Sequence, residues 1–173
     1  MAGVQVLQDG NPRVGGMDDD ECEQCVHDIV SWFERKAEIV SRGEKRASIE
    51  ALEKELGRPI PDALRGLLSK QSGGLWFDEY KTLGADDIAR TAESLSRASG
   101  WKTSFVPFAA DADGNALVTD AAAKGAVFAF GDDGRGRDLA PSLSQYLEDY
   151  RNRLLSGRFD FVEDVGLVER TRK

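Results

Sequence analysis

The segment Pro59-Ile60-Pro61 places the tightest constraint on how this chain can fold. Proline lacks a backbone N–H and fixes φ, so a helix cannot continue through this segment. Apolar residues recur at helical spacing on both sides, and Gly57 and Gly73-Gly74 are placed to end the two patterns. We therefore predict a helix at about 45–56 and a second, short helix from Pro61, joined by an extended link. Their expected inner faces are Ile49, Leu52 and Leu56, and Leu64, Leu67 and Leu68.

A further helix is predicted ahead of these two. Four acids, Asp18 to Glu21, precede an apolar stripe, and acids suit the positive end of a helix dipole. The stripe predicts a helix that ends near Gly43. Its apolar face would be Val26, Ile29, Val30, Phe33, Ala37 and Val40. Residues 1–17 carry glycine, proline and asparagine without sustained periodicity, and we interpret them as a flexible N-terminal tail.

The pattern changes after Gly74. Short apolar runs typical of strands occur at 75–77, 105–109, 116–120 and 126–130, with two more around Phe159 and Val168. Pro107 should confine its run to a sheet edge or a strand end. Helical patterns return at 86–99 and 141–155. Helices first and strands later predict an α+β fold, with helices packed on one face of a mostly antiparallel sheet. Its expected core adds Val127, Phe128, Phe130, Leu143 and Leu147.

Composition restricts the class of protein. The chain has 173 residues, 40% hydrophobic and 31% charged, which fits one globular domain. No apolar run approaches the roughly 20 residues of a membrane span, and the N-terminus lacks the pattern of a secretory signal. We therefore expect a cytoplasmic protein with no membrane insertion.

Charge restricts the class of partner. The net charge is −8 and the sequence pI is about 4.8. Such a surface repels nucleic acid, so no nucleic-acid partner is expected. The acidity serves solubility on one interpretation. On the other, it attracts a basic protein partner.

Three blocks of residues together resemble the SUKH superfamily. The first, similar to its opening signature, is Ile49-Glu50-x-Leu52-Glu53-x-x-Leu56-Gly57-x-x-Ile60-Pro61-x-x-Leu64-x-x-Leu67-Leu68, ending in Gly73-Gly74. The second, similar to its central strand and turn, is Phe105-Val106-Pro107-Phe108-Ala109 with Asp113-Gly114-Asn115. The third, similar to its later strand and closing helix, is Gly125-Ala126-Val127-Phe128-Ala129-Phe130 with Leu139-Ala140-Pro141-Ser142-Leu143-Ser144-Gln145-Tyr146-Leu147.

The resemblance covers about residues 45–150. It implies a single SUKH-like domain over 18–173, with 18–43 as an extra N-terminal helix and 156–173 as a C-terminal extension. It also implies a fold that works by binding proteins: many bacterial members are immunity proteins that neutralise toxins, and eukaryotic members include scaffolds and regulatory subunits. Our leading hypothesis is a non-catalytic, immunity-type inhibitor that binds a toxin and needs no cofactor. The alternative is an accessory or scaffold subunit of a larger assembly, which would dock through the extra helix and the tails.

Cys22 and Cys25 form a C-x-x-C pair near the start of the first predicted helix. A helix dipole can stabilise a thiolate, so a thiol redox enzyme is a further alternative. Zinc would need about four ligands, and His27 is the only histidine, so no metal site is predicted. No two carboxylates stand out as a general acid and base. We interpret the two thiols as inert and the chain as not an enzyme.

The candidate partner-binding residues lie in predicted loops, because a rigid scaffold can present loops to a partner. They are Trp101, Asp111, Asp113, Asp132, Asp133, Arg135 and Arg137. Residues 111–115 predict a hairpin turn, and residues 131–138 predict a polar, glycine-rich loop. The acids would attract a basic partner, Arg135 and Arg137 could clamp a carboxylate of that partner, and Trp101 would be an exposed aromatic anchor. Solvated loops without a binding role are the alternative.

Overall fold

The computed structural model describes residues 19–39, 42–122 and 125–170. The predicted tail, residues 1–17, lies outside this part of the chain. The helices are α2 (Asp19–Lys36), α3 (Arg46–Leu56), α4 (Asp62–Lys70), α5 (Ala85–Leu95) and α6 (Leu143–Leu155). The strands are β2 (Trp76–Phe77), β3 (Tyr80–Thr82), β4 (Phe105–Ala110), β5 (Ala116–Asp120), β6 (Ala126–Gly131), β7 (Gly134–Ala140), β8 (Phe159–Val162) and β9 (Gly166–Glu169). None of the helices that the structure describes is long and apolar enough to cross a membrane.

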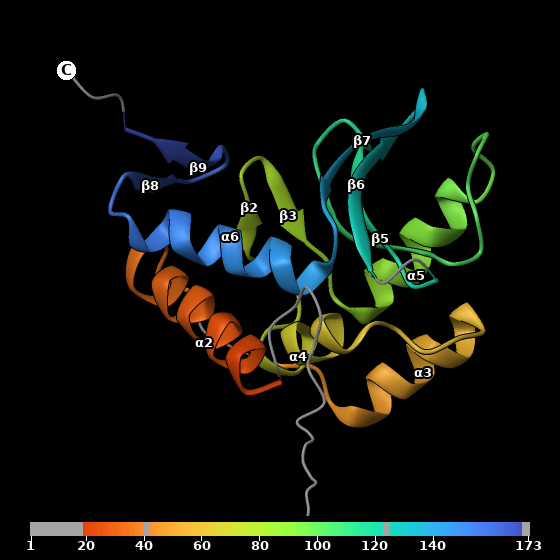
Figure 1. The fold of residues 1–173 in the computed structure, drawn as a ribbon, viewed down its shortest axis with the longest axis horizontal. Helices are drawn as coiled ribbons and strands as arrows, with labels where there is room; N and C mark the ends of the chain where they lie inside the picture. Colours follow the sequence, from red (N-terminus) through yellow and green to blue (C-terminus); the bar gives the residue numbers. More distant parts are fainter. Residues whose placement is uncertain (1–18, 40–41, 123–124, 171–173) are drawn as a thin grey trace, which may run out of the picture.

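The main sheet is an antiparallel meander. Its strands follow one another in the order β2-β3-β4-β5-β6-β7, and β8 pairs with β9 in a separate two-stranded sheet. Helices α2 and α4 pack against α6, which lies across the meander (Figure 1). The predicted α+β class with an antiparallel sheet is confirmed.

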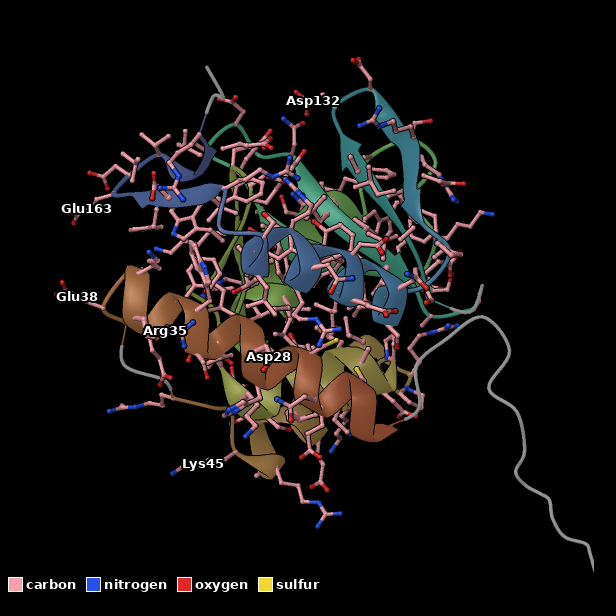
Figure 2. The ribbon with its side chains drawn as sticks, turned by 60° about the vertical axis from the view of Figure 1, so that its left-hand side comes forward. Asp28, Arg35, Glu38, Lys45, Asp132 and Glu163 are labelled. Carbon is pink, nitrogen blue, oxygen red and sulfur yellow. The ribbon has the colours of Figure 1, made fainter. Side chains whose placement is uncertain are left out.

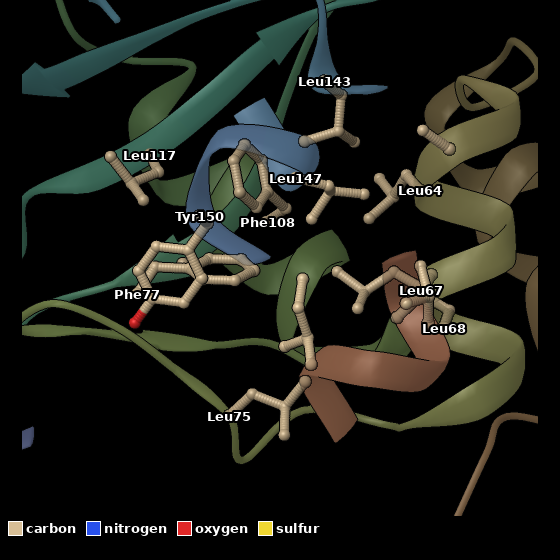
Figure 3. Packing of buried hydrophobic residues seen from close by; sticks show 14 of the residues in the cluster. Leu64, Leu67, Leu68, Leu75, Phe77, Phe108, Leu117, Leu143, Leu147 and Tyr150 are labelled. Carbon is tan, nitrogen blue, oxygen red and sulfur yellow. The ribbon is translucent and has the colours of Figure 1, made fainter. Parts of the chain in front are cut away.

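Two hydrophobic clusters cover the two faces of the meander. Leu117 and Val118 are neighbours in β5 and belong to different clusters, because successive residues of a strand point to opposite faces. The main cluster holds Leu117 together with apolar residues of α2, α3, α4 and α6. Figure 3 shows Leu64, Leu67 and Leu68 of α4 beside Leu143 and Leu147 of α6. The second cluster consists of Phe105, Ala116, Val118, Phe128 and Phe130, with Leu95, Ala98 and Trp101 packed against it. The end of α5 therefore covers a face for which the sequence predicted no helix.

The predicted core residues are buried, apart from Leu56, which is half-buried. Gly57 ends α3 as expected, in the left-handed conformation with φ 78°. In contrast, α2 ends at Lys36, well before Gly43. Glu38 has φ 54°, and this left-handed backbone is incompatible with a continuing helix. Val40 lies outside the described residues.

Pro107 lies in an internal strand, so the predicted sheet edge is wrong. β4 runs between β3 and β5, but β3 pairs only with Ala109 and Ala110 of β4. Pro107 is therefore paired on one side, with Val118 of β5. A register shift between Pro107 and Ala109 follows it. The missing N–H of proline thus costs the sheet no hydrogen bond toward β3.

The predicted loop at residues 131–138 is also wrong. Only Asp132 and Asp133 form the turn, and Gly134 already begins β7. The Gly-Arg-Gly-Arg sequence gives no apolar alternation, and β7 is an edge strand whose residues are mostly exposed. Pairing with the buried strand β6 supplies the order that the local sequence does not indicate. The short strand β3 was not predicted either.

Replacing two glycines of the helical region with alanine should change the stability in opposite directions. Gly66 lies inside α4, and a Cβ built there meets no atom within 4 Å. Gly66→Ala should therefore stabilise the protein by about 0.5–1 kcal/mol, because alanine has the higher helix propensity. Gly57 has equally open space but a positive φ. Gly57→Ala should destabilise by about 1–2 kcal/mol. Denaturant unfolding of both variants measures the pair, and a stabilising Gly57→Ala would contradict the backbone argument.

Both terminal additions belong to the main hydrophobic cluster. α2 supplies Val26, Ile29, Val30, Trp32 and Phe33. The β8–β9 hairpin supplies Phe159 and Leu167, and the N–H of Leu167 donates to the Asp78 carbonyl at 3.3 Å. These segments are packed on the meander and α6 and do not extend from them as separate docking arms.

Candidate functional site

The topology of the meander brings three acidic turns to one end of the sheet. In an antiparallel meander, every second turn lies at the same end, so the β2–β3, β4–β5 and β6–β7 turns are neighbours. We call this end, made of residues 78–79, 111–115 and 132–133, the acidic end. Its acids are Asp78, Glu79, Asp111, Asp113, Asp132 and Asp133. In Figure 2, Asp132 projects from the molecule at this end.

The β4–β5 turn is built by the carboxylate of Asp111. One of its oxygens accepts the backbone N–H groups of Asp113 and Asn115, both at 2.9 Å, and Gly114 supplies the left-handed φ of 88°. Asp111 is half-buried, whereas Asp113 is exposed. Asp111 therefore shapes the turn, and Asp113 presents its charge to solvent.

The β6–β7 turn touches the β4–β5 turn. Gly131 and Gly134 pair across it, which leaves Asp132 and Asp133 at the tip, and both acids are exposed. A Cβ added at Gly131 would lie 2.1 Å from Oδ1 of Asn115, so the two turns are in direct contact. The structure thus brings together the four acids that the sequence singled out.

Arg135 and Arg137 point to different faces of β7. The Arg135 guanidinium lies 3.9 Å from the centre of the Phe128 ring and donates to Asp138 at 2.7 Å. Phe128 belongs to the second cluster, whereas Arg137 lines a hollow with Leu117 on the main-cluster face. Register shifts between β6 and β7 separate the two side chains. The structure therefore does not bring these two arginines together on one face of β7.

Trp101 lies close to the acidic end, but it is half-buried and not the exposed anchor that the sequence predicted. Its ring packs edge-on against Phe105 and Phe130, with centroids 5.3 and 5.1 Å apart. The Ser99 carbonyl, two residues earlier, lies 3.4 Å from where a Cβ at Gly134 would be. The segment that carries Trp101 therefore borders the β6–β7 turn.

Sequence reasoning missed the β2–β3 turn. The Arg153 guanidinium forms an ion pair with Asp78 at 2.8 Å, and the Tyr150 hydroxyl donates to the Trp76 carbonyl and accepts the Asp78 N–H. This fixes the left-handed φ of 57° at Asp78. Burial raises the pKa of Tyr80, and the carboxylates of Glu79, Asp111 and Asp78 raise it further. The β2–β3 and β4–β5 turns therefore share one electrostatic environment.

A hollow of about 420 Å³ lies between α6 and the acidic end. Its aromatic wall is Tyr80, Tyr146 and Tyr150, and Arg137 and Arg153 also line it. The rings of Tyr146 and Tyr150 are parallel, with centroids 6.3 Å apart. Burial raises the pKa of Tyr146 and of Tyr150, so both phenols stay protonated at neutral pH.

The two cysteines lie on α2, away from the acidic end. Cys25 is only 1% exposed, and Cys22 is half-buried. Burial raises the pKa of Cys25 to about 11, although Arg151 opposes the shift. This is opposite to the depressed pKa that a redox-active thiol needs. His27 is exposed, and no three potential metal-ligating side chains cluster among the residues that the structure describes.

Thiol labelling should reflect this burial. At pH 7 we expect Cys25 to react with iodoacetamide far more slowly than Cys22, because it is inaccessible and protonated. Mass spectrometry of the labelled peptides over time gives both rates, and labelling in denaturant provides the control. Fast labelling of Cys25 in the folded protein at pH 6 would reopen the redox interpretation.

Comparison with known proteins places the chain in a family. The sequence profile of the SMI1 / KNR4 family (SUKH-1) matches residues 43–149. A search of curated proteins finds no match. The matched range runs from before α3 to the next-to-last turn of α6, and leaves out α2 and the β8–β9 hairpin. Because the match covers more than half of the chain, and the motifs lie on the helices and strands expected of them, the chain belongs to the SMI1 / KNR4 family (SUKH-1).

Proposed function

We propose that the chain is a non-catalytic domain that binds a basic toxin through its acidic end and thereby neutralises the toxin. SUKH domains are protein-interaction modules, which supports binding as the activity. The observation that carries the proposal is the gathering of acids on three neighbouring turns at one end of a rigid sheet.

Most of the carboxylates on these turns are exposed to solvent and not compensated by a nearby cation among the described residues. Glu79, Asp113, Asp132 and Asp133 are exposed, and none forms an ion pair with a described residue. Asp78 is neutralised by Arg153. Unpaired acids on loops raise the encounter rate with a basic surface and reject acidic competitors.

The burial of α2 weakens one argument for the alternative hypothesis, that the chain is an accessory or scaffold subunit of a larger assembly. That hypothesis used the extra N-terminal helix as a docking segment. Val26, Ile29 and Phe33 of α2 are buried in the main cluster, so the apolar face of the helix is already occupied. An inhibitor that acts through the acidic end is therefore the favoured proposal.

Reconstitution of a purified complex tests the function. Affinity purification from an extract of the source cells, followed by mass spectrometry, provides the candidate partner, and the purified pair is then assayed directly. We expect a stoichiometric complex with a basic protein whose toxic activity falls as the chain is added. A bound protein that keeps full activity, or that enters a multi-protein assembly, would support the subunit hypothesis instead.

Charge reversal at the turn tip should slow association. Asp132→Lys with Asp133→Lys replaces two exposed acids, so we expect a roughly tenfold lower association rate and a weaker dependence on salt. The matched control is Glu23→Lys with Glu38→Lys, which changes the net charge equally at exposed sites on and beside α2, away from the acidic end. Surface biosensor kinetics at several salt concentrations measure both variants. Equal rates for the two variants would place the site away from the β6–β7 turn.

A further inference from the structure

A second hollow, of about 370 Å³, lies on the side of the molecule where α3 ends beside α5. Its floor is apolar. It consists of Leu56 of α3, Ala89 and Ala92 of α5, Trp101, which precedes β4, and Phe105, the first residue of β4. Trp101 is half-buried here, with its ring held by Phe105 and Phe130. The hollow therefore has an aromatic surface in a fixed orientation.

Two carboxylates flank this floor. Glu55 on α3 and Glu93 on α5 both line the hollow and are exposed. Neither forms an ion pair with any residue in the described ranges, although several other acids of the helices do. Thr103 completes the lining, and none of the described residues that line the hollow is cationic. Two negative charges thus face an apolar floor without a compensating positive charge.

The end of α3 adds to this negative field. α3 ends at Leu56, next to the hollow, and a helix carries a partial negative charge at its C-terminus. The backbone N–H groups of Gly57 and Arg58 donate to carbonyls of the last turn, Glu53 and Lys54. They compensate only part of the negative charge at this helix end, because other carbonyls of the last turn receive no such hydrogen bond from the residues that the structure describes. A positively charged group is the complement of such a site.

We propose that this hollow receives one arginine or lysine side chain of the partner protein. The methylene stem would pack on Leu56 and Ala92, the cation would lie at Trp101, and Glu55 and Glu93 would accept its hydrogen bonds. Tryptophan is the aromatic residue that binds cations most strongly. A purely apolar anchor would leave both carboxylates uncompensated.

This inference rests on the proposed function, because it assigns an anchor of the same basic partner. The site is distinct from the acidic turns but continuous with them, since the Ser99 carbonyl approaches Gly134 at the β6–β7 turn. The acidic turns would provide long-range attraction, and the hollow would provide a specific contact.

Nuclear magnetic resonance of the full chain tests the site with a small probe. The capped peptide acetyl-Gly-Arg-Gly-amide is titrated while the three tryptophan indole N–H signals are followed. We expect a saturable shift of the Trp101 signal, with the signal of the buried Trp32 unchanged as an internal control. The same peptide with glutamate in place of arginine should produce no saturable shift. A third peptide carries norleucine, an uncharged side chain of similar length, in place of arginine. An equal shift of the Trp101 signal with this peptide would overturn the proposal, because it would show an apolar site that does not select for charge.

Neutral variants separate the carboxylates from the fold. Glu55→Gln with Glu93→Gln keeps shape and exposure, so the protein should fold normally and bind the arginine peptide about tenfold more weakly. Glu23→Gln with Glu163→Gln carries the same charge change and should bind as the wild type does. Unchanged affinity in the Glu55/Glu93 variant, or no Trp101 shift with the arginine peptide, overturns the inference.

Binding of the purified partner distinguishes this inference from the proposed function. In one outcome, the Asp132/Asp133 reversal slows association, while Glu55→Gln with Glu93→Gln leaves the affinity for the partner unchanged. That result would contradict the hollow as an anchor site and would support binding through the acidic end. If only the glutamine variant weakens binding, the anchor stands and the acidic end is wrong.

Discussion

Replacing Phe33 with alanine should lower the free energy of unfolding by about 3–5 kcal/mol, because a fully buried aromatic side chain is lost and a cavity remains. Phe33 is 0% exposed, and its ring packs edge-on against Trp32 at 5.0 Å and Phe161 at 6.4 Å. It lies on α2, outside the range that matches the family. The large expected effect therefore tests whether this added helix is part of the folded core.

Arg35→Ala provides the matched control, since Arg35 is two residues further along α2 and exposed (Figure 2). It should change the stability by less than about 0.5 kcal/mol. Chemical denaturation followed by circular dichroism measures both variants. A cost below about 1 kcal/mol for Phe33→Ala would mean that α2 packs loosely and that the family core is stable without it.

Truncation after Gly157 should destabilise the protein by roughly 3–6 kcal/mol. It removes Phe159 and Leu167, which are 4% and 9% exposed, and burial of one such side chain contributes about 1.5–3 kcal/mol. It also removes Phe161, which packs against Phe33 and Trp76. The loss would expose apolar surface that the C-terminal hairpin now covers.

Removal of residues 171–173 alone is the control for this truncation, because it leaves β8 and β9 complete. We expect its melting temperature to equal that of the full chain, and we expect the longer truncation to melt well below it. Equal melting temperatures for the two truncations would show that the hairpin only lies on the surface.

The helices could be predicted well because their signals are local. Pro59 and Pro61 separate α3 from α4, Gly57 ends α3, and apolar spacing identified the buried face of α4. β7 could not be predicted, because Arg135 is stabilised by the ring of Phe128 on the neighbouring strand and not by an apolar pattern of its own. The end of α2 at Lys36 likewise depends on the backbone at Glu38, which carries no glycine or proline signal.

Four of the six acids at the acidic end followed from the sequence. Asp132 and Asp133 stood between glycines, which predicted an exposed turn. Asp78 and Glu79 were missed because their strands are only two and three residues long. Their position beside Asp111 depends on the strand order of the whole meander, which no local pattern shows.

Hydrogen exchange of the chain, alone and in complex with its purified partner, tests the central claim most directly. Backbone amides buried by a partner exchange more slowly, and the described turns are well separated from α2 along the sequence. We expect the added protection at the three acidic turns, residues 78–79, 111–115 and 132–133, with α2 unchanged. Protection confined to α2, with the three acidic turns exchanging as in the isolated chain, would contradict binding through the acidic end.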